Sequence, residues 1–254
     1  MYTKIKRKIP SLLFILILII IWSIISALDI IPKFMLPSPI SILNAFINNF
    51  TTLTQHSLVT LFETIIGLAI SIVLSFTFAV LMDRYKIIKQ TIYPLLVATQ
   101  TVPTIAIAPI LILFLGYGIL PKIILVTLCC FFPITISLTE GFFNVDKDYL
   151  NLLKSMNASY PQTLIHLKIP FTIPYFFSGL KVSVTYAFIS AVVAEWLGGA
   201  FGLGVYMIRV KSAYAFDKFF ASILFISIIS FIFLRFVNLL QRKALTRMHI
   251  NKRG

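Results

Sequence analysis

Long runs of apolar residues, each about as long as a membrane is thick, are the main pattern along this chain. A helix needs about 20 mostly apolar residues to cross the hydrocarbon core of a bilayer. Runs such as Leu12–Ile25 and Ala221–Leu234 lack the polar face that a surface helix of a soluble protein carries. The pattern therefore predicts an all-α membrane protein with six transmembrane helices. We place them near residues 10–28, 57–81, 91–115, 122–140, 174–197 and 219–240.

Composition and charge extend this prediction to the orientation of the chain. Hydrophobic residues make up 59% of the sequence and charged residues 12%, whereas soluble proteins are about half apolar and a quarter charged. Lys and Arg number 22 against 8 Asp and Glu, and 17 of the 22 fall in the N-terminal tail, the second and fourth connections and the C-terminal end. Because cytoplasmic segments retain Lys and Arg, we expect both termini in the cytoplasm. The charge therefore indicates orientation and argues against a nucleic-acid-binding surface.

The first apolar segment and the two cysteines each allow a second interpretation. A basic tail before an apolar run is also typical of a signal peptide, but this run is long and lacks a small-residue cleavage site. We therefore expect an uncleaved first helix. Cys129 and Cys130 are adjacent within one predicted span, and we interpret them as packing residues rather than as a disulfide or a metal site.

The sequence has no recognisable catalytic or metal-binding motif. It lacks a phosphate-binding loop and a nucleophile elbow, and His56, His166 and His249 lie far apart along the chain. We therefore predict a transport protein rather than an enzyme, without a metal site and with no cofactor bound by this chain. A membrane enzyme acting on lipid is disfavoured for the same reasons. Glu63 and Glu195 are the two carboxylates well inside predicted spans, so an ion-coupled secondary transporter stays as the alternative.

The longest predicted cytoplasmic connection, residues 141–173, contains an amphipathic stretch. Tyr149, Leu152, Leu153 and Met156 are spaced so that they share one face of a helix. An apolar stripe on a cytoplasmic helix must be buried against the membrane surface, the protein's own spans or a partner subunit. The residues alone leave these three alternatives open.

A sharp turn and a second short helix are predicted to follow this stretch. Asn157 tolerates the left-handed conformation that closes a helix. Ser159 and Gln162 have the spacing of a capping box, and Pro170 is expected to end the second helix.

Prolines interrupt the third predicted span, residues 91–115. Pro94, Pro103 and Pro109 each remove a backbone donor from this segment. They are interpreted either as structural kinks or as breaks that turn carbonyl groups toward a cavity.

Glycines beside the end of the fifth span form another candidate cluster. Gly198 and Gly202 have a G-x-x-x-G spacing, which fits either close helix approach or a glycine turn in a loop. Glu195 beside them is interpreted as a residue of an outer gate or, preferably, as a hydrogen-bonding partner of a neighbouring helix. A pairing of Glu63 with Lys181 is also conceivable, although no spacing supports it.

Several stretches of the chain resemble motifs of the permease subunits of bacterial binding-protein-dependent ABC importers. The connection above resembles the E-A-A-x-x-x-G-x9-I-x-L-P signature, with Asn151–Leu153 at the E-A-A positions, Asn157 at the glycine and Pro170 at its end. Asn151 departs from the family's glutamate and lacks the charge that an ionic contact at that position needs. The other resembling stretches are Phe34–Ser41, His56–Gly67, Thr99–Gly118 and Glu195–Gly204.

This resemblance implies a six-span type-1 permease fold with a cytoplasmic coupling helix. Such permeases work as dimers with two ATPase subunits, which hold ATP and Mg, and with an extracytoplasmic substrate-binding protein. A homodimer in the bacterial plasma membrane, surrounded by lipid, is implied for this chain. The residues expected to contact the ATPase are Tyr149, Leu152, Leu153, Met156, Asn157 and Ala158. Those expected in the pathway or gate are Pro103, Pro109, Glu195, Gly202 and Gly204.

The resemblance also implies domain limits and a substrate class. Residues 1–56 would form a cytoplasmic tail, the first span and an external amphipathic segment, 57–241 the transmembrane domain, and 242–254 a basic cytoplasmic tail. The chain looks most like the nitrate, sulfonate and taurine branch. Within it, Thr60–Gly67 and Glu195–Met207 resemble permeases for a thiamine pyrimidine precursor or riboflavin.

Overall fold

A computed structural model describes residues 9–29, 31–32, 34–99 and 101–247, and the regular structure in these residues is helical throughout. The basic residues expected in the tails at 1–8 and 248–254, and Lys33, lie outside the described residues. The helices are α2 (Ile9–Ala27), α3 (Pro39–Asn48), α4 (Phe50–Arg84), α5 (Lys86–Thr99), α6 (Thr104–Leu115), α7 (Ile119–Phe143), α8 (Lys147–Ser155), α9 (Tyr160–Thr163), a π-helical turn (Leu164–Lys168), α10 (Ile169–Trp196), α11 (Leu203–Ser212) and α12 (Phe216–Arg247).

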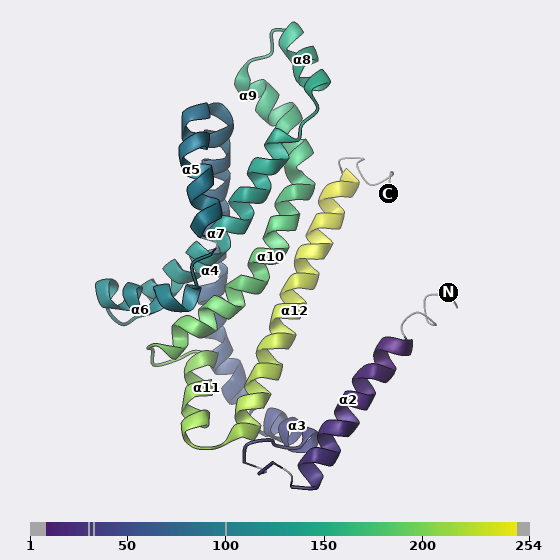
Figure 1. Ribbon diagram of the computed structural model, residues 1–254, viewed down its shortest axis with the longest axis vertical. Coiled ribbons are helices and arrows are strands. Elements are labelled where there is room, and N and C mark those ends of the chain that lie inside the picture. The colour runs from purple at the N-terminus through teal and green to yellow at the C-terminus, as the bar shows by residue number, and fades with distance from the viewer. Residues whose placement is uncertain (1–8, 30, 33, 100, 248–254) are drawn as a thin grey trace.

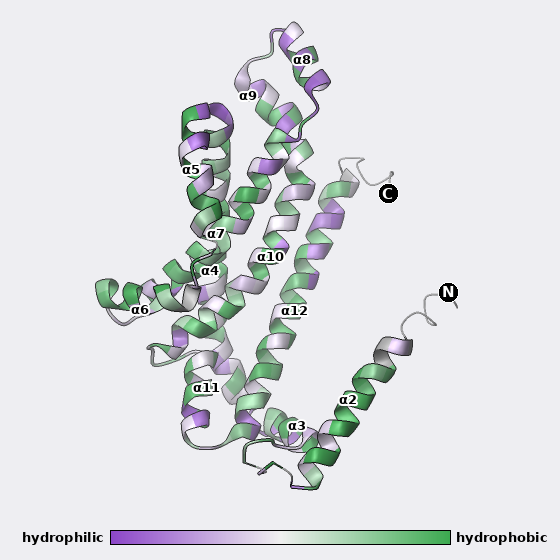
Figure 2. Cartoon of the chain, in the orientation of Figure 1, coloured by the Kyte–Doolittle hydropathy of each residue, from purple (hydrophilic) through white to green (hydrophobic). Residues whose placement is uncertain are grey.

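Within the described residues, four helices are long and apolar enough to cross a membrane. They are α4, α7, the continuous helix Tyr160–Trp196 that includes α10, and α12. They contain the predicted spans at 57–81, 122–140, 174–197 and 219–240, apart from a residue at one edge. In Figure 1 these helices run along the long axis, with α8 and α9 at one end and α3 and α11 at the other. Apolar residues predominate along most of their length (Figure 2), as a membrane-spanning helix requires.

The third predicted span is not a single helix. It is divided into α5, which ends at Thr99, and α6, which begins at Thr104, and α6 turns away from the direction of α5 (Figure 1). Pro103 is the residue at the N-terminal cap of α6. A proline disfavours the helical conformation of the residue before it, which explains a break at this point. Pro94 and Pro109 lie inside helices, so of the three prolines only Pro103 stands at the break.

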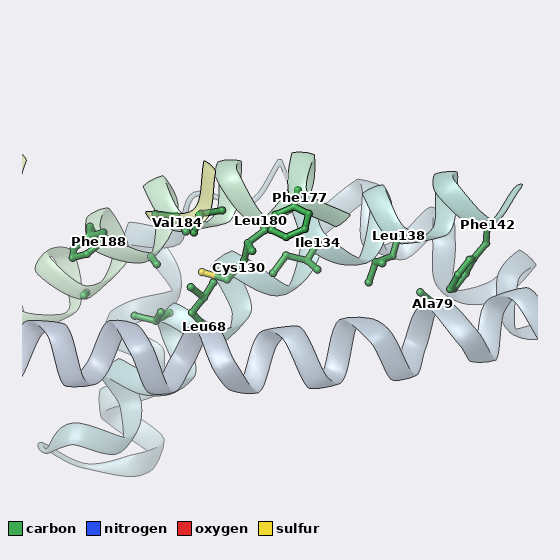
Figure 3. Packing of buried hydrophobic residues seen from close by; sticks show 14 residues of the cluster. Leu68, Ala79, Cys130, Ile134, Leu138, Phe142, Phe177, Leu180, Val184 and Phe188 are labelled. Carbon is green, nitrogen blue, oxygen red and sulfur yellow. The ribbon is translucent and has the colours of Figure 1, made fainter. Parts of the chain in front are cut away.

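The core lies where α4, α7 and α10 pack along each other (Figure 3). Small residues bring the backbones close together: a Cβ on Gly67 of α4 would clash with the Val126 side chain of α7. The hydroxyl of Ser71 donates to the carbonyl of Thr127 across the same pair of helices at 2.8 Å. In lipid the hydrophobic effect adds little between helices, so close packing and such hydrogen bonds hold them together.

Candidate coupling surface and translocation pathway

The α8 helix ends in a compact turn that the sequence predicts. Asn157 has φ 55°, in the left-handed region that asparagine tolerates better than most residues. Its N–H donates to the carbonyl of Lys154, and the N–H of Ala158 donates to that of Leu153, both at 3.0 Å. These two bonds form a Schellman motif, which satisfies carbonyls that the end of the helix leaves unpaired. The predicted sharp turn at Asn157 is therefore confirmed.

The apolar face of α8 is open in the folded chain. The side chains of Tyr149, Leu152 and Met156 are 58%, 57% and 69% exposed, and Leu153 and Ala158 are partly buried. This face lies at the end of the molecule opposite α3 and α11 (Figure 1). Of the three alternatives for burying the stripe, packing against the protein's own spans is therefore wrong.

The second short helix does not end at Pro170. Ser159 is its N-cap and forms the predicted capping box with Gln162, in which the N–H of Ser159 donates to Oε1 of Gln162 at 2.7 Å. Helix α9 then passes through the π-helical turn into α10, where Pro170 lies in the first turn. The N–H of Ile169 donates to the carbonyl of Leu164, five residues back. A wider turn of this kind accommodates a proline that would break a regular α-helix.

Glu195 is buried beside the glycine loop, residues 197–202 between α10 and α11, at the end of the molecule opposite α8. Its side chain is 1% exposed, and its carboxylate accepts hydrogen bonds from Thr60 Oγ1 at 2.7 Å and from the N–H of Gly204 at 2.5 Å. Gly202 has φ 131°, and a Cβ on it would clash with this carboxylate. Only glycine combines that backbone conformation with such a close approach.

The N-terminal part of α4 completes this cluster. Thr60 Oγ1 accepts a hydrogen bond from the N–H of Leu203 at 2.9 Å, and His56 Nδ1 accepts one from the N–H of Gly202 at 3.2 Å. The glycine loop is thus tied to α4 through side chains. Glu195, Gly202 and Gly204 lie together, and the contacts of Glu195 match its interpretation as a hydrogen-bonding partner of neighbouring helices. The role of these residues in a gate stays a prediction. Gly198 and Gly202 belong to this loop and not to a contact between two helices.

The Glu63 carboxylate pairs with Lys122 rather than with Lys181. The distance between Lys122 Nζ and Glu63 Oε1 is 2.9 Å, and both side chains are almost fully buried. Lys122 lies in the first turn of α7, where sequence position alone places it in an external connection. Its apolar flanks, Pro121 and Ile123, were the available signal that it enters the core.

A cavity of about 370 Å³ lies between α7, α10 and the break that separates α5 from α6. Thr99, Ser137, Ser178 and Tyr186 are the hydroxyl-bearing residues among its otherwise mainly apolar lining residues. Pro103 and Pro109 do not line the cavity, and both are exposed. A chamber of this kind has the size and the sparse polar groups of a small-molecule site.

The described residues offer no group of three or more His, Cys, Asp or Glu side chains that could hold a metal ion. Cys129 and Cys130 are both free and buried, which agrees with their interpretation as packing residues.

The family model for the inner membrane component of binding-protein-dependent transport systems matches residues 71–246. A formylaminopyrimidine transport permease from Halalkalibacterium halodurans is 39% identical over 228 residues, which cover 88% of this chain and 91% of that protein. A probable ABC transporter permease from Haemophilus influenzae is 34% identical over 224 residues, which cover 88% of this chain and 91% of that protein.

The fold has a counterpart among solved structures. A chain from the crystal structure of an amino acid ABC transporter with histidines superposes with a TM-score of 0.62, at 16% identity, over 79% of this chain and 96% of that one. Other relatives are permeases named for aliphatic sulfonates, riboflavin, nitrate and taurine, which confirms the predicted branch. The chain therefore belongs to the binding-protein-dependent transport family: it is a multi-pass plasma-membrane protein and the permease subunit of an ABC importer.

Proposed function

We propose that this permease forms the translocation pathway of an ATP-driven importer and that α8 is its coupling helix. The observation that carries the proposal is the open apolar face of Tyr149, Leu152 and Met156, on a helix closed by the hydrogen-bonded turn at Asn157. An exposed apolar face at the end of a membrane protein favours a protein partner. Leu153, Asn157 and Ala158 complete the surface that would contact the ATPase.

The proposed orientation places α8 and both chain ends in the cytoplasm. In Figure 1, α2 runs from its first residue toward α3, and α12 runs from α11 toward the end that carries α8. Basic residues at the end of α12, among them Arg242 and Lys243, fit the positive-inside rule. We propose six spans in total, with α2 as the first and with α5 and α6 together as the broken third.

The proposed assembly contains two copies of this chain, two ATPase subunits and one substrate-binding protein. ATP and Mg would be bound by the ATPases, since this sequence has no phosphate-binding loop. The binding protein would dock at the end with α3 and α11, opposite the coupling helix. ATP-driven closure of the ATPases would then move the two α8 helices and switch access to the pathway.

The proposed substrate is a small organic solute, with formylaminopyrimidine as the first candidate. The relative named for that compound is 39% identical along most of both chains. The hydroxyl groups of Ser137, Ser178 and Tyr186 in the cavity could hydrogen-bond a polar heterocycle as it passes.

Reconstitution tests this proposal. Proteoliposomes that contain the permease, its ATPase and its binding protein should take up labelled formylaminopyrimidine only when ATP is supplied on the ATPase side. Taurine, nitrate and riboflavin serve as competing solutes for the substrate assignment. Uptake driven by a proton or sodium gradient, with ATPase and binding protein left out, would establish the secondary transporter instead.

A further inference from the structure

A cluster of charged and aromatic side chains joins the C-terminal end of α4 to residues 160–168, which form the base of the loop that carries α8. Lys168 Nζ donates to both carboxylate oxygens of Asp83, at 2.6 and 2.8 Å. The hydroxyl of Tyr160 donates to Oδ2 of Asp83 at 3.0 Å. The guanidinium of Arg84 lies 4.4 Å from the centre of the Tyr160 ring. One carboxylate thus binds the first residue of α9 and the last residue of the π-helical turn.

Burial makes this ion pair stronger than an ordinary surface pair. The side chain of Asp83 is 3% exposed and that of Lys168 is 14% exposed. Charge-assisted hydrogen bonds in such surroundings are less screened by water and salt than those on an open surface. Loss of the Lys168 ammonium would leave the Asp83 carboxylate buried beside a single hydroxyl donor, which is unfavourable.

The position of the cluster along the chain gives it a mechanical consequence. Ala158 and Ser159 alone separate the turn at Asn157 from Tyr160, so a displacement of α8 passes directly to α9. The π-helical turn Leu164–Lys168 interrupts the regular α-helix that follows, and such interruptions are places where helices bend. Asp83 holds both ends of the segment that contains this weak point.

We propose that Asp83 is a positioning residue for energy coupling. By holding Tyr160 and Lys168, it makes the base of the α8 loop, the π-helical turn and the end of α4 move as one unit. A displacement of α8 is then passed to α4 and α10 instead of being absorbed by bending at Leu164–Lys168. This inference rests on the proposed role of α8 as the coupling helix.

The first test measures how strongly Asp83 stabilises residues 160–168 in the purified permease, without any partner. Asp83→Asn and Lys168→Met should each raise amide hydrogen exchange across residues 160–168 by about fivefold or more, because even a modest loss of local stability changes an opening equilibrium by that factor. Lys168→Arg keeps the charge and the donors and should exchange like the wild type. Lys243→Met, which removes an exposed charge near the end of α12, is the matched control. Unchanged exchange in Asp83→Asn would overturn the proposal, as would Lys168→Arg behaving like Lys168→Met.

The second test measures transmission in the assembled importer. The affinity of Asp83→Asn for the ATPase should equal that of the wild type, because the contact surface on α8 is intact. Stimulation of ATP hydrolysis by the binding protein loaded with formylaminopyrimidine should fall by about fivefold or more, as expected when two coupled sites lose their connection. Wild-type stimulation in this variant would overturn the proposal. Normal binding of Leu152→Asp to the ATPase would instead refute α8 as the coupling helix, and the exchange measurement, made on the permease alone, does not depend on that outcome.

Discussion

Single side chains determine how the glycine loop is held against α4. Thr60 donates its one hydroxyl hydrogen to Glu195 and accepts a hydrogen bond from the N–H of Leu203, so it serves two buried groups at once. The sequence places Thr60, Glu195 and the glycines in recognisable motifs. The sequence contains no signal that the hydroxyl of Thr60 meets the carboxylate of Glu195, which lies 135 positions further along the chain.

Thr60→Val should destabilise the permease while keeping the shape of the side chain. The substitution removes partners from a buried carboxylate and a buried N–H, and each such loss costs about 1–3 kcal/mol. We expect a clearly lower unfolding temperature in detergent solution. Thr77→Val is the matched control, because its exposed hydroxyl bonds only to its own helix, at the carbonyl of Val73. Equal unfolding temperatures for the two variants would show that Thr60 does not hold the loop.

The pair formed by Glu63 and Lys122 allows a test by double substitution. Lys122→Met leaves the Glu63 carboxylate buried without its cation, and losing one partner of a buried pair costs about 3–5 kcal/mol. Adding Glu63→Gln removes the unpaired charge and should recover part of this loss. The unfolding temperatures of the two single variants and the double variant measure the effect. If the double variant lost as much stability as the two single variants added together, the pairing would be contradicted.

At the scale of elements, α8 combines a strong local turn with a face that the rest of the chain leaves uncovered. Its periodicity and the asparagine turn are readable in the sequence because they depend only on neighbouring residues. The continuation of α9 into α10 was not predictable in that way. Pro170 normally ends a helix, and only the π-helical turn before it lets the chain continue.

Leu152→Asp should weaken the association of the permease with its ATPase. A charge on the apolar face would be desolvated in the interface, and residues at the centre of an interface commonly contribute about 2 kcal/mol or more to binding. Folding should be little affected, because Leu152 is exposed in the free chain. Co-purification of the two subunits from membranes measures the association.

The matched control for this experiment introduces the same charge on α8 outside the apolar face. Ser155 is exposed and its hydroxyl donates to the carbonyl of Asn151 in the same helix, so we expect Ser155→Asp to co-purify like the wild type. Normal recovery of the ATPase with Leu152→Asp would show that this face is not the contact surface.

At the scale of the whole molecule, α7 and α10 enclose a cavity against the break between α5 and α6. Three of its polar residues, Ser137, Ser178 and Tyr186, come from positions that carry no motif and look like ordinary residues of apolar spans. The fourth, Thr99, begins the stretch Thr99–Gly118 that resembles the family. The predicted pathway prolines, Pro103 and Pro109, do not line it, although Pro103 caps α6 next to the break.

Ser178→Trp should block uptake by filling this cavity with a large side chain. Ser178 is exposed in the cavity wall, so the larger residue can be accommodated without displacing the core. We expect uptake of formylaminopyrimidine close to background, with normal ATPase association. Ser227→Trp is the control, since Ser227 is exposed toward a separate hollow between α10 and α12 and does not line this cavity. Undiminished uptake in Ser178→Trp would exclude this cavity from the pathway.

The sequence by itself determined the membrane class, most helix positions, the expected orientation and the family. Each of these depends on composition, on hydrophobic length or on short motifs, which are properties of neighbouring residues. Only the tertiary structure decided that Glu63 pairs with Lys122, that Glu195 holds the glycine loop and that Asp83 holds the base of the α8 loop. These contacts join residues far apart along the chain, and which distant side chains meet is fixed by the packing of whole helices.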